Sequence, residues 1–234
     1  MVINDLDITL SRKAMKSIRI TIKGPDALVR VSAPFWVTDR EIRSFILAKW
    51  DWIIKSRAKV MERSKAIPKK KEYITGEKHL LFGEFYEMQV IENSIGPAIQ
   101  LRQNQILLFV RPSTTPEKRG LIVESWYRTC LQKEIEELVQ KWSLRLNEPN
   151  VKWGIRKMKA RWGSCSPSKR SLLFNLGLAC VPLPCVEYVV VHEFTHLQEC
   201  HHNNHFKNLM SQHLPEWPKL KKYLNIFAQK NMIP

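Results

Sequence analysis

The 234-residue chain lacks a long hydrophobic run, and no segment approaches the roughly 18 continuous apolar residues of a membrane-spanning helix. Its first residues are polar and mixed in charge, without the apolar stretch of a signal peptide. Hydrophobic residues make up 44% and charged residues 26%, as in ordinary soluble globular proteins. We therefore expect a soluble, cytoplasmic protein with no membrane partner.

The chain also lacks the cysteine pairs of a disulfide framework or of a Cys-x-x-Cys metal site. Its five cysteines are odd in number and widely spaced, namely Cys130, Cys165, Cys180, Cys185 and Cys200. In a cytoplasmic chain this pattern indicates reduced and mostly buried thiols. Cys200 lies near the histidines described below, and metal binding by Cys200 is the less favoured hypothesis.

Acidic residues are scarce relative to basic ones. The sequence has 22 Asp and Glu against 38 Lys and Arg, which gives a formal net charge of +16. A strong positive field favours polyanionic partners, so nucleic acid and nucleotides are candidate partners through a basic surface. A basic but passive surface explains the charge equally well.

Internal repeats and low-complexity segments are absent, and hydrophobic periodicity indicates the secondary structure. Thr38 and Glu41 have the spacing of a capping box, and Pro116 suits the first turn of a long helix. The predicted elements are strands at 17–22 and 28–31 around a turn at 24–27, a helix over 38–54, strands at 86–91 and 99–110, a helix from Thr114 or Thr115 to Leu146, extended segments at 151–158 and 172–178, and a helical C-terminus.

Strands grouped apart from helices predict an α+β fold. A basic, proline-containing connector at residues 63–72 suggests a boundary between two parts of the chain. We predict a β-rich lobe of hairpin, helix and connector at residues 1–75, and a second domain at residues 76–234.

Six of the seven histidines lie between His192 and His213. In a helix, His192 and His196 share a face and can bind one metal ion, and Glu193 can accept a proton from the metal-activated water. The preceding residues 186–191 are apolar and β-branched, which by propensity favours a strand. Because the histidine spacing needs a helix, we predict a helix buried on all sides.

A catalytic zinc site usually has three protein ligands. The candidates for the third ligand are His201, His202 and His205, and Glu199 is a less favoured candidate. His202 follows His196 at the spacing of the longer metzincin motif, but Glu199 occupies the position of that motif's glycine. The spacing favours His202, and His205 is the alternative.

Several motifs resemble the YgjP-like metallopeptidase family, which is related to the WLM and SprT-like groups of gluzincins. They extend over most of the chain. They are Ser-Ile-Arg-Ile at 17–20, the tryptophan-rich helix at 42–53, the strand region containing Gly83, Arg-Trp-Gly-Ser-Cys at 161–165, Phe-Asn-Leu at 174–176, Tyr-Val-Val-Val-His-Glu-Phe-Thr-His-Leu at 188–197, His202 and Phe206.

The resemblance implies a zincin-like domain with an active-site helix and a small adjacent sheet. By this resemblance the zinc ligands are His192, His196 and His202, and the catalytic base is Glu193. Residues 161–165 would form a turn between two strands beside the zinc, with Arg161 or Asn175 available to the substrate or to the frame of the active site.

The sequence departs from the family pattern around the third histidine. The family commonly has Asn, Ser and Trp where this chain has His201, Asn203 and Lys207. The ligand assignment is unaffected, but the rim of the site is expected to differ.

These observations predict a zinc-dependent hydrolase, a metallopeptidase that acts on a peptide or protein substrate through metal-activated water, with Glu193 as general base. One alternative is a nucleotide pyrophosphatase that uses the same zinc site and holds phosphates with Lys and Arg. The other is a non-catalytic, zinc-stabilised module that binds nucleic acid, although such a site has no need for Glu193.

Overall fold

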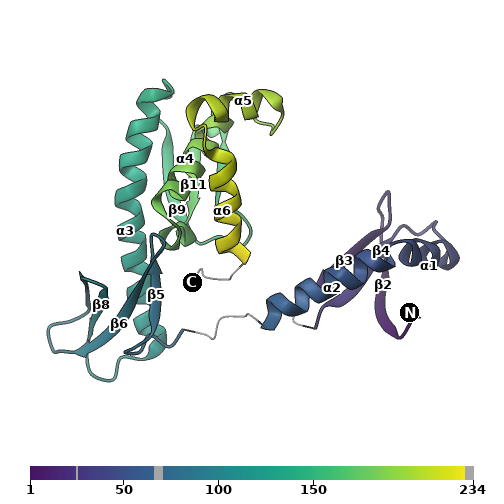
Figure 1. Cartoon of the computed structure of the whole chain (residues 1–234), viewed down its shortest axis with the longest axis horizontal. Coiled ribbons are helices and arrows are strands. Elements are labelled where there is room, and N and C mark those ends of the chain that lie inside the picture. Colours follow the sequence, from purple (N-terminus) through teal and green to yellow (C-terminus); the bar gives the residue numbers. More distant parts are fainter. Residues whose placement is uncertain (25, 66–70, 230–234) are drawn as a thin grey trace. The chain divides into compact units, whose positions relative to one another are not determined.

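The computed structural model describes residues 1–24, 26–65 and 71–229 (Figure 1). The chain divides into two compact units, unit 1 (Met1–Pro68) and unit 2 (Lys69–Pro234). The predicted connector at 63–72 falls largely on residues outside the described ranges, as does residue 25 of the predicted turn.

Unit 1 contains a four-stranded sheet and two helices. Its elements are β1 (Val2–Ile3), β2 (Leu6–Arg12), β3 (Arg19–Lys23), β4 (Leu28–Ala33), α1 (Asp39–Ala48) and α2 (Trp50–Lys65). The strand order is β1-β2-β4-β3, in which β4 is parallel to β2 and antiparallel to β3. The predicted hairpin is confirmed as β3 and β4, whereas the sequence pattern did not reveal β1 and β2.

The helix predicted over residues 38–54 is two helices. The capping box is confirmed, because Oγ1 of Thr38 accepts the N–H of Glu41 at 3.3 Å and the Glu41 carboxylate accepts the N–H of Thr38 at 2.8 Å. The prediction of one continuous helix is wrong. α1 ends where the N–H of Lys49 bonds to the carbonyl of Ile46 at 3.1 Å, a tighter turn than the α-helical one.

Both helices of unit 1 cover the same face of its sheet. Apolar side chains from strands and helices form a core of their own, with the members Ile3, Leu6, Ile8, Val29, Val31, Ala33, Val37, Ile42, Ile46 and Ile53. Burial of these side chains provides the main stabilisation of this unit.

Unit 2 begins with a second four-stranded sheet. Its strands are β5 (Lys78–Leu81), β6 (Glu84–Glu92), β7 (Ala98–Arg102) and β8 (Gln105–Val110), in the order β5-β6-β8-β7. The predicted strand at 86–91 is confirmed within β6. The run at 99–110 is a hairpin of β7 and β8, because Gln103 adopts a positive φ of 51° between them.

The turn between β5 and β6 attaches this sheet to the segment that precedes the histidine helix. The N–H of Phe82 donates to the carbonyl of Ala179 at 2.8 Å. At Gly83, whose φ is +89°, a Cβ would lie 2.7 Å from Cγ of Pro182. This close approach explains the glycine in the motif region.

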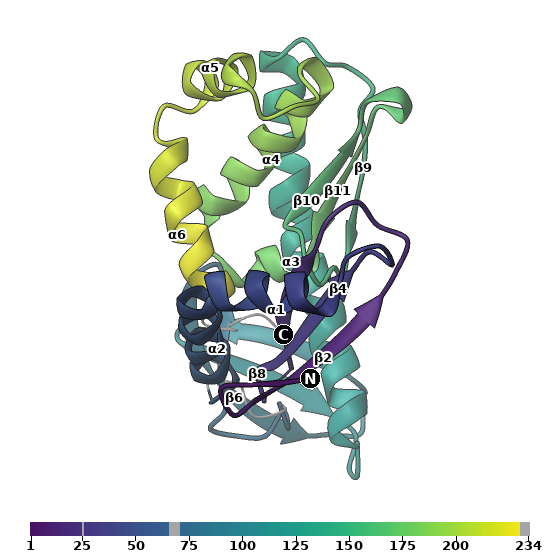
Figure 2. The same cartoon turned by 90° about the vertical axis from the view of Figure 1, so that its right-hand side faces the viewer.

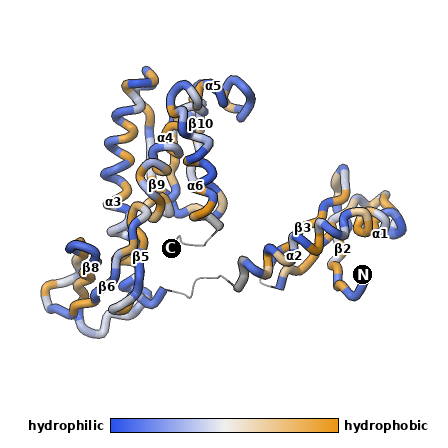
Figure 3. Tube along the Cα trace, viewed as in Figure 1, coloured by the Kyte–Doolittle hydropathy of each residue, from blue (hydrophilic) through white to orange (hydrophobic). Residues whose placement is uncertain are grey.

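A long helix, α3 (Pro116–Arg145), confirms the second predicted helix. Oγ1 of Thr115 accepts the N–H of Lys118 at 3.4 Å, and Pro116 occupies the first turn. Hydrophobic and hydrophilic residues alternate along α3 (Figure 3). Its buried side chains recur every three or four residues, as Val123, Tyr127, Leu131, Ile135, Val139 and Trp142.

The remainder of unit 2 contains the third sheet and three helices. The elements are β9 (Lys152–Arg156), β10 (Gly163–Ser166), β11 (Ser171–Asn175), α4 (Leu183–Gln198), α5 (Asn204–His213) and α6 (Trp217–Gln229), with 3-10 turns at Pro167–Lys169 and Leu176–Cys180. β11 is central, antiparallel to β10 and parallel to β9. This sheet lies beside α4 (Figure 2). The extended segment predicted at 151–158 contains β9, and the one predicted at 172–178 is extended only as far as Asn175 in β11. Residues 176–178 belong to the 3-10 turn instead, where the Asn175 side chain accepts the N–H of Gly177.

Over the described residues the chain has six α-helices and three small sheets, so the predicted α+β class is confirmed. Within the same residues no helix is both long and apolar enough to cross a membrane. The five cysteines are free thiols. Cys200 is exposed and the other four are at least partly buried.

Candidate metal centre

The helix α4 is buried on nearly all sides, and this explains how a β-branched segment becomes helical. Pro182 is its N-cap and Pro184 lies in the first turn, where a missing N–H breaks no helical bond. The helix packs against α3, α5, α6 and β10. Tertiary burial outweighs the weak helical propensity of the valines. The predicted buried helix is confirmed, with the buried residues Cys185, Val186, Tyr188, Val189, Val190, Val191, Glu193, Phe194 and Thr195.

Three imidazole nitrogens converge near the end of α4. His192 and His196 lie one turn apart, and His202 comes from the loop between α4 and α5. Nε2 of His202 lies 3.0 Å from Nε2 of His192 and 3.2 Å from Nε2 of His196. Around a tetrahedral zinc ion with Zn–N bonds of about 2.05 Å, two ligand nitrogens are about 3.3 Å apart. The spacing of these nitrogens therefore fits a single metal ion.

The structure brings His202 to this cluster and leaves the alternatives outside it. His201 and His205 are exposed and do not belong to the group of converging ligand atoms. Cys200 is exposed as well and stands outside the same group.

The main chain at Glu199 orients His196. Nδ1 of His196 lies 3.0 Å from the carbonyl oxygen of Glu199, so Nδ1 carries the proton and Nε2 keeps its lone pair for a metal. Glu199 has φ −138° and ψ 111°, an extended conformation that any residue adopts. The chain therefore turns here without the glycine of the metzincin motif.

Asn203 starts the next helix directly after the third histidine. Its Oδ1 accepts the N–H of Phe206 at 2.9 Å, which makes Asn203 the N-cap of α5. Serine and asparagine are comparably good N-caps. The departure from the family's serine therefore preserves the turn that follows His202.

Phe206 packs against all three histidine rings. Its ring centroid lies 5.0 Å from that of His192, 4.7 Å from that of His196 and 4.8 Å from that of His202. Burial, together with the nearby His196, His202 and Lys221, lowers the pKa of His192 to about 3. Burial also lowers the pKa of His202. These imidazoles are therefore neutral, which is the form that binds metal.

Glu193 is buried against a glycine of the neighbouring sheet. Only 5% of its surface is exposed. A Cβ placed on Gly163 of β10 would lie 2.6 Å from Oε1 and 2.9 Å from Cδ of Glu193. Burial raises the pKa of Glu193 to about 8, and Arg161 acts in the opposite direction. Gly163 therefore makes room for the carboxylate.

The segment at 161–165 differs from its expected form. A turn between two strands was expected there, but Gly163–Ser166 is the strand β10 itself. The turn falls later, at Pro167–Lys169, where the carbonyl of Pro167 accepts the N–H of Arg170 at 3.0 Å. Gly163 allows the Glu193 side chain of α4 to approach the sheet closely. The strand conformation of β10 follows from its pairing with β11.

The side chain of Asn175 holds the loop that carries Arg161. Its Nδ2 donates to the carbonyls of Met158 at 2.9 Å and Arg161 at 2.7 Å. Its Oδ1 accepts the N–H groups of Met158 at 3.3 Å and Gly177 at 3.0 Å. These four bonds use both N–H groups and both lone pairs of the amide, and only 6% of the Asn175 surface is exposed. Asn175 therefore positions the loop, and Arg161 on that loop is exposed.

Sequence comparison identifies one matching family over most of the chain. The family model described as "YgjP-like, metallopeptidase domain" matches residues 16–227. No curated protein matches the chain.

Proposed function

This chain belongs to the YgjP-like metallopeptidase family, and we propose that it is a zinc-dependent peptidase that hydrolyses peptide bonds. One observation carries the proposal: three imidazole nitrogens converge, and the residue that follows the first of these histidines in the sequence is a buried glutamate. His192, His196 and His202 are the proposed metal ligands, and Glu193 is the proposed base.

The donor set supports zinc as the metal. Three imidazole ligands suit zinc, whereas magnesium and calcium prefer oxygen ligands. The group has three protein ligands within the described residues, as in catalytic zinc sites, while structural zinc sites close with a fourth. When bound, zinc supplies a Lewis acid that polarises the scissile carbonyl and lowers the pKa of water.

Glu193 is proposed to transfer the proton during hydrolysis. It follows His192 on α4, and its carboxylate is in close contact with Gly163 of β10. From there it would take a proton from the attacking water and deliver it to the leaving amine. The burial of Glu193 limits competition from bulk solvent.

The strand β10 is proposed to bind the main chain of the substrate. β10 is an edge strand of its sheet and pairs with β11 on one side. An extended peptide can add to such an edge through main-chain hydrogen bonds. Because Gly163 of β10 contacts Glu193, a peptide on this edge would lie close to the proposed base.

Arg161 is proposed to bind an anionic group of the substrate. It is exposed directly before β10, on the loop that Asn175 holds. Between Glu148 and Glu187 the chain has seven basic residues and no acidic one. A surface of one charge sign favours ligands of the opposite sign, here a peptide with acidic side chains.

The same cations support a second candidate function, hydrolysis of a nucleoside triphosphate. Lys159 and Arg161 are both exposed on the loop before β10 and could hold phosphates. A purely structural zinc module is less favoured, because it would have no use for a carboxylate buried beside the ligands.

Replacement of the proposed base tests the function. Zinc content, casein cleavage and hydrolysis of a nucleoside triphosphate panel are measured for the unaltered protein, Glu193→Gln and Glu216→Gln, whose altered side chain is exposed on another segment. All three proteins should bind zinc. Glu193→Gln should lose at least about a hundredfold in the rate of casein cleavage, and Glu216→Gln should lose nothing.

Three other outcomes of this experiment would each contradict the proposed function or part of it. A fully active Glu193→Gln protein would refute the role of this carboxylate as base. Hydrolysis of triphosphates without casein cleavage would favour the second candidate function. A zinc-loaded protein that hydrolyses neither substrate would favour the structural module.

A separate comparison tests Arg161. Arg161→Gln should raise KM several-fold for a peptide with acidic side chains and leave kcat nearly unchanged, because the lost contact binds ground state and transition state alike. Lys152→Gln, which removes an exposed charge at the start of β9, is the matched control. Equal KM values for acidic and neutral peptides in the unaltered protein would contradict the assignment.

A further inference from the structure

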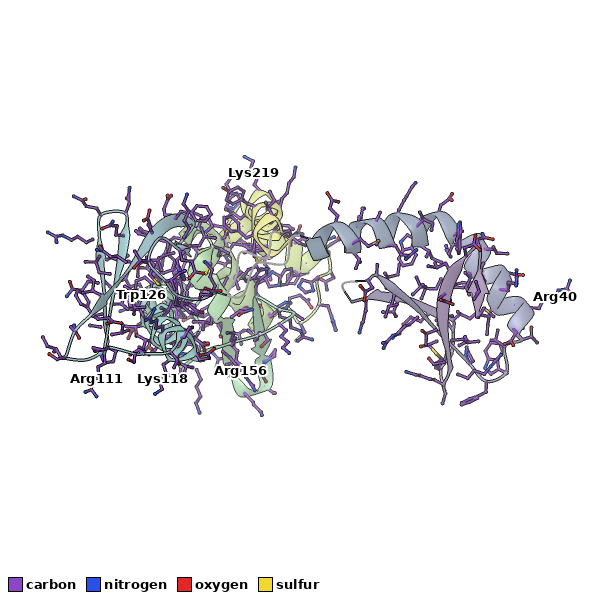
Figure 4. The ribbon with its side chains drawn as sticks, turned by 90° about the horizontal axis from the view of Figure 1, so that it is seen from below. Arg40, Arg111, Lys118, Trp126, Arg156 and Lys219 are labelled. Carbon is purple, nitrogen blue, oxygen red and sulfur yellow. The ribbon has the colours of Figure 1, made fainter. Side chains whose placement is uncertain are left out.

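The sheet of unit 1 has one covered face and one open face. Along β4, Val29 and Val31 are fully buried, while Arg30 between them is exposed. The buried side chains pack under α1 and α2. In Figure 4 α2 lies along one side of the strands, and Arg40 of α1 projects into solvent. Alternate residues of β2, β3 and β4 therefore face away from both helices.

The strand register shows which side chains share the open face. Arg30 stands between Thr9 of β2 and Thr21 of β3. One row along, Ser32 stands between Ser11 and Arg19 in the same way. Register partners lie side by side, about 4.8 Å apart between strands. We define the open face as Thr9, Ser11, Arg19, Thr21, Lys23, Leu28, Arg30 and Ser32.

The three cations of the open face have no acidic partner. Within the described residues, Arg19, Lys23 and Arg30 form no ion pair. One acidic residue of the strands, Asp7 of β2, alternates in phase with Thr9 and Ser11 and lies on the same side of the sheet, next to β1. Residues 1–68 contain 14 Lys and Arg against 7 Asp and Glu, so the wider unit is basic as well. With three cations against the single carboxylate of Asp7 among the strands, this side of the sheet is a net positive surface.

The side chains of the open face indicate which class of anionic partner fits it best. Between its cations it carries four hydroxyl groups, and Ser11 and Ser32 approach each other with their Oγ atoms 3.1 Å apart. Arginine, lysine, serine and threonine are the usual contacts to phosphate oxygens. Aromatic side chains are common where proteins stack on bases, bind other proteins or enter a membrane surface, and the open face has none. Leu28 is its one apolar residue.

We propose that the open face of unit 1 binds the phosphate backbone of double-stranded nucleic acid, without reading its sequence. The cations would neutralise phosphates and the hydroxyls would donate hydrogen bonds to phosphate oxygens. With three phosphate contacts, affinity should fall about fortyfold between roughly 50 and 200 mM salt. This inference is independent of the chemistry at the metal centre.

Two charge-matched variants of the full, zinc-loaded protein test the proposal. The sheet variant carries Arg19→Gln, Lys23→Gln and Arg30→Gln. The helix variant carries Arg43→Gln, Lys55→Gln and Lys59→Gln, which are exposed positions on the helices. Both lose the same net charge. Binding to a labelled mixed-sequence DNA duplex of about 20 base pairs is measured by fluorescence anisotropy over a salt series.

The sheet variant should bind the duplex at least tenfold more weakly than the unaltered protein, and its log affinity should depend on log salt with a slope smaller by about 3. The affinity of the helix variant for the duplex should change by less than about threefold, because its substitutions act on the duplex only through the long-range electrostatic field. Duplexes of different sequence should bind alike. The single variants Arg30→Gln and Arg43→Gln repeat the comparison if a triple variant unfolds.

Three results would overturn the proposal. Equal losses in the two variants would mean that net charge, and not the open face, governs binding. Absence of duplex binding by the unaltered protein at low salt would exclude the partner. Tighter binding to polyglutamate or to vesicles containing phosphatidylserine than to the duplex would assign the face to an acidic protein or a membrane.

Discussion

At the scale of single residues, the contact between Gly163 and Glu193 links two motifs far apart in the sequence. The glycine lies on β10 and the glutamate on α4. The space that a side chain would occupy at Gly163 is already filled by the Glu193 carboxylate. A tight packing contact, and not a backbone turn, therefore accounts for this glycine.

A Gly163→Ala substitution should separate metal binding from hydrolysis. The added methyl would lie 2.6 Å from Oε1 of Glu193, so the carboxylate must move. We expect full zinc content and at least about a tenfold loss of kcat, because misplaced catalytic groups lose rate steeply. Zinc analysis and peptide hydrolysis measure the two properties.

Gly154→Ala is the matched control for this experiment. Its methyl would meet only Cδ2 of Leu173 at 3.6 Å, an ordinary contact on the same sheet. Unchanged kcat in Gly163→Ala, or equal losses in both variants, would show that the contact with Glu193 does not matter for catalysis.

The residue scale also shows how far the sequence could predict the site. The pairing of His192 with His196 follows from helical periodicity, which is a local property. The choice of His202 rested on spacing and family resemblance. The packing of Phe206 against the three rings and the hydrogen bonds of Asn175 to its loop depend on contacts between separate segments, and hydrophobic patterns do not encode such contacts.

At the scale of elements, two caps delimit the loop that carries His202. The N–H of Glu199 bonds to the carbonyl of Thr195 at 2.9 Å and closes α4. Asn203 opens α5 through its bond to the N–H of Phe206. With both ends tied, this short loop has few conformations to lose when His202 binds a metal.

Replacement of the cap at Asn203 should therefore weaken metal binding. Asn203→Ala should cost about 1 kcal/mol of stability and lower zinc affinity several-fold, because the cap adjoins His202. Asn203→Ser should retain both properties, since serine caps helices as well as asparagine does. Chelator competition measures zinc affinity, and thermal unfolding measures stability. Indistinguishable alanine and serine variants would refute the role of the cap.

Sequence patterns predicted some elements well and others poorly for physical reasons. The helix α3 has both a regular apolar repeat and a capped start, so local signals agree with the fold. β10 has the sequence Gly-Ser-Cys-Ser, without the alternation of a strand, and its conformation comes from pairing with β11. The end of α1 at Lys49 was missed because the apolar residues continue into α2 at helical spacing.

At the scale of the whole molecule, the chain has two separate hydrophobic cores. One consists of residues of unit 1 and the other of residues of unit 2. The proposed zinc ligands all belong to unit 2, and the open face belongs to unit 1. Each unit thus has the means to be stabilised and to bind a ligand by itself.

Calorimetry should show two unfolding transitions that respond to different changes. Removal of zinc should lower only the transition of unit 2, because at a zinc concentration of about 100 Kd binding contributes about 2.7 kcal/mol to that unit. Ile46→Ala should lower only the transition of unit 1, by about 2–5 kcal/mol, because Ile46 is fully buried in its core. One transition that shifts with both changes would mean that the cores unfold together.

The contact between Gly163 and Glu193 also bears on how related sequences are classified. A relative that keeps the histidines and the glutamate but has a larger residue in place of the glycine would pass a motif search for the zinc site. Its carboxylate could not occupy the same place. Such a chain is expected to be a pseudoenzyme that binds zinc without hydrolysing its ligand, and this glycine marks where catalysis could be lost in evolution while the metal remains.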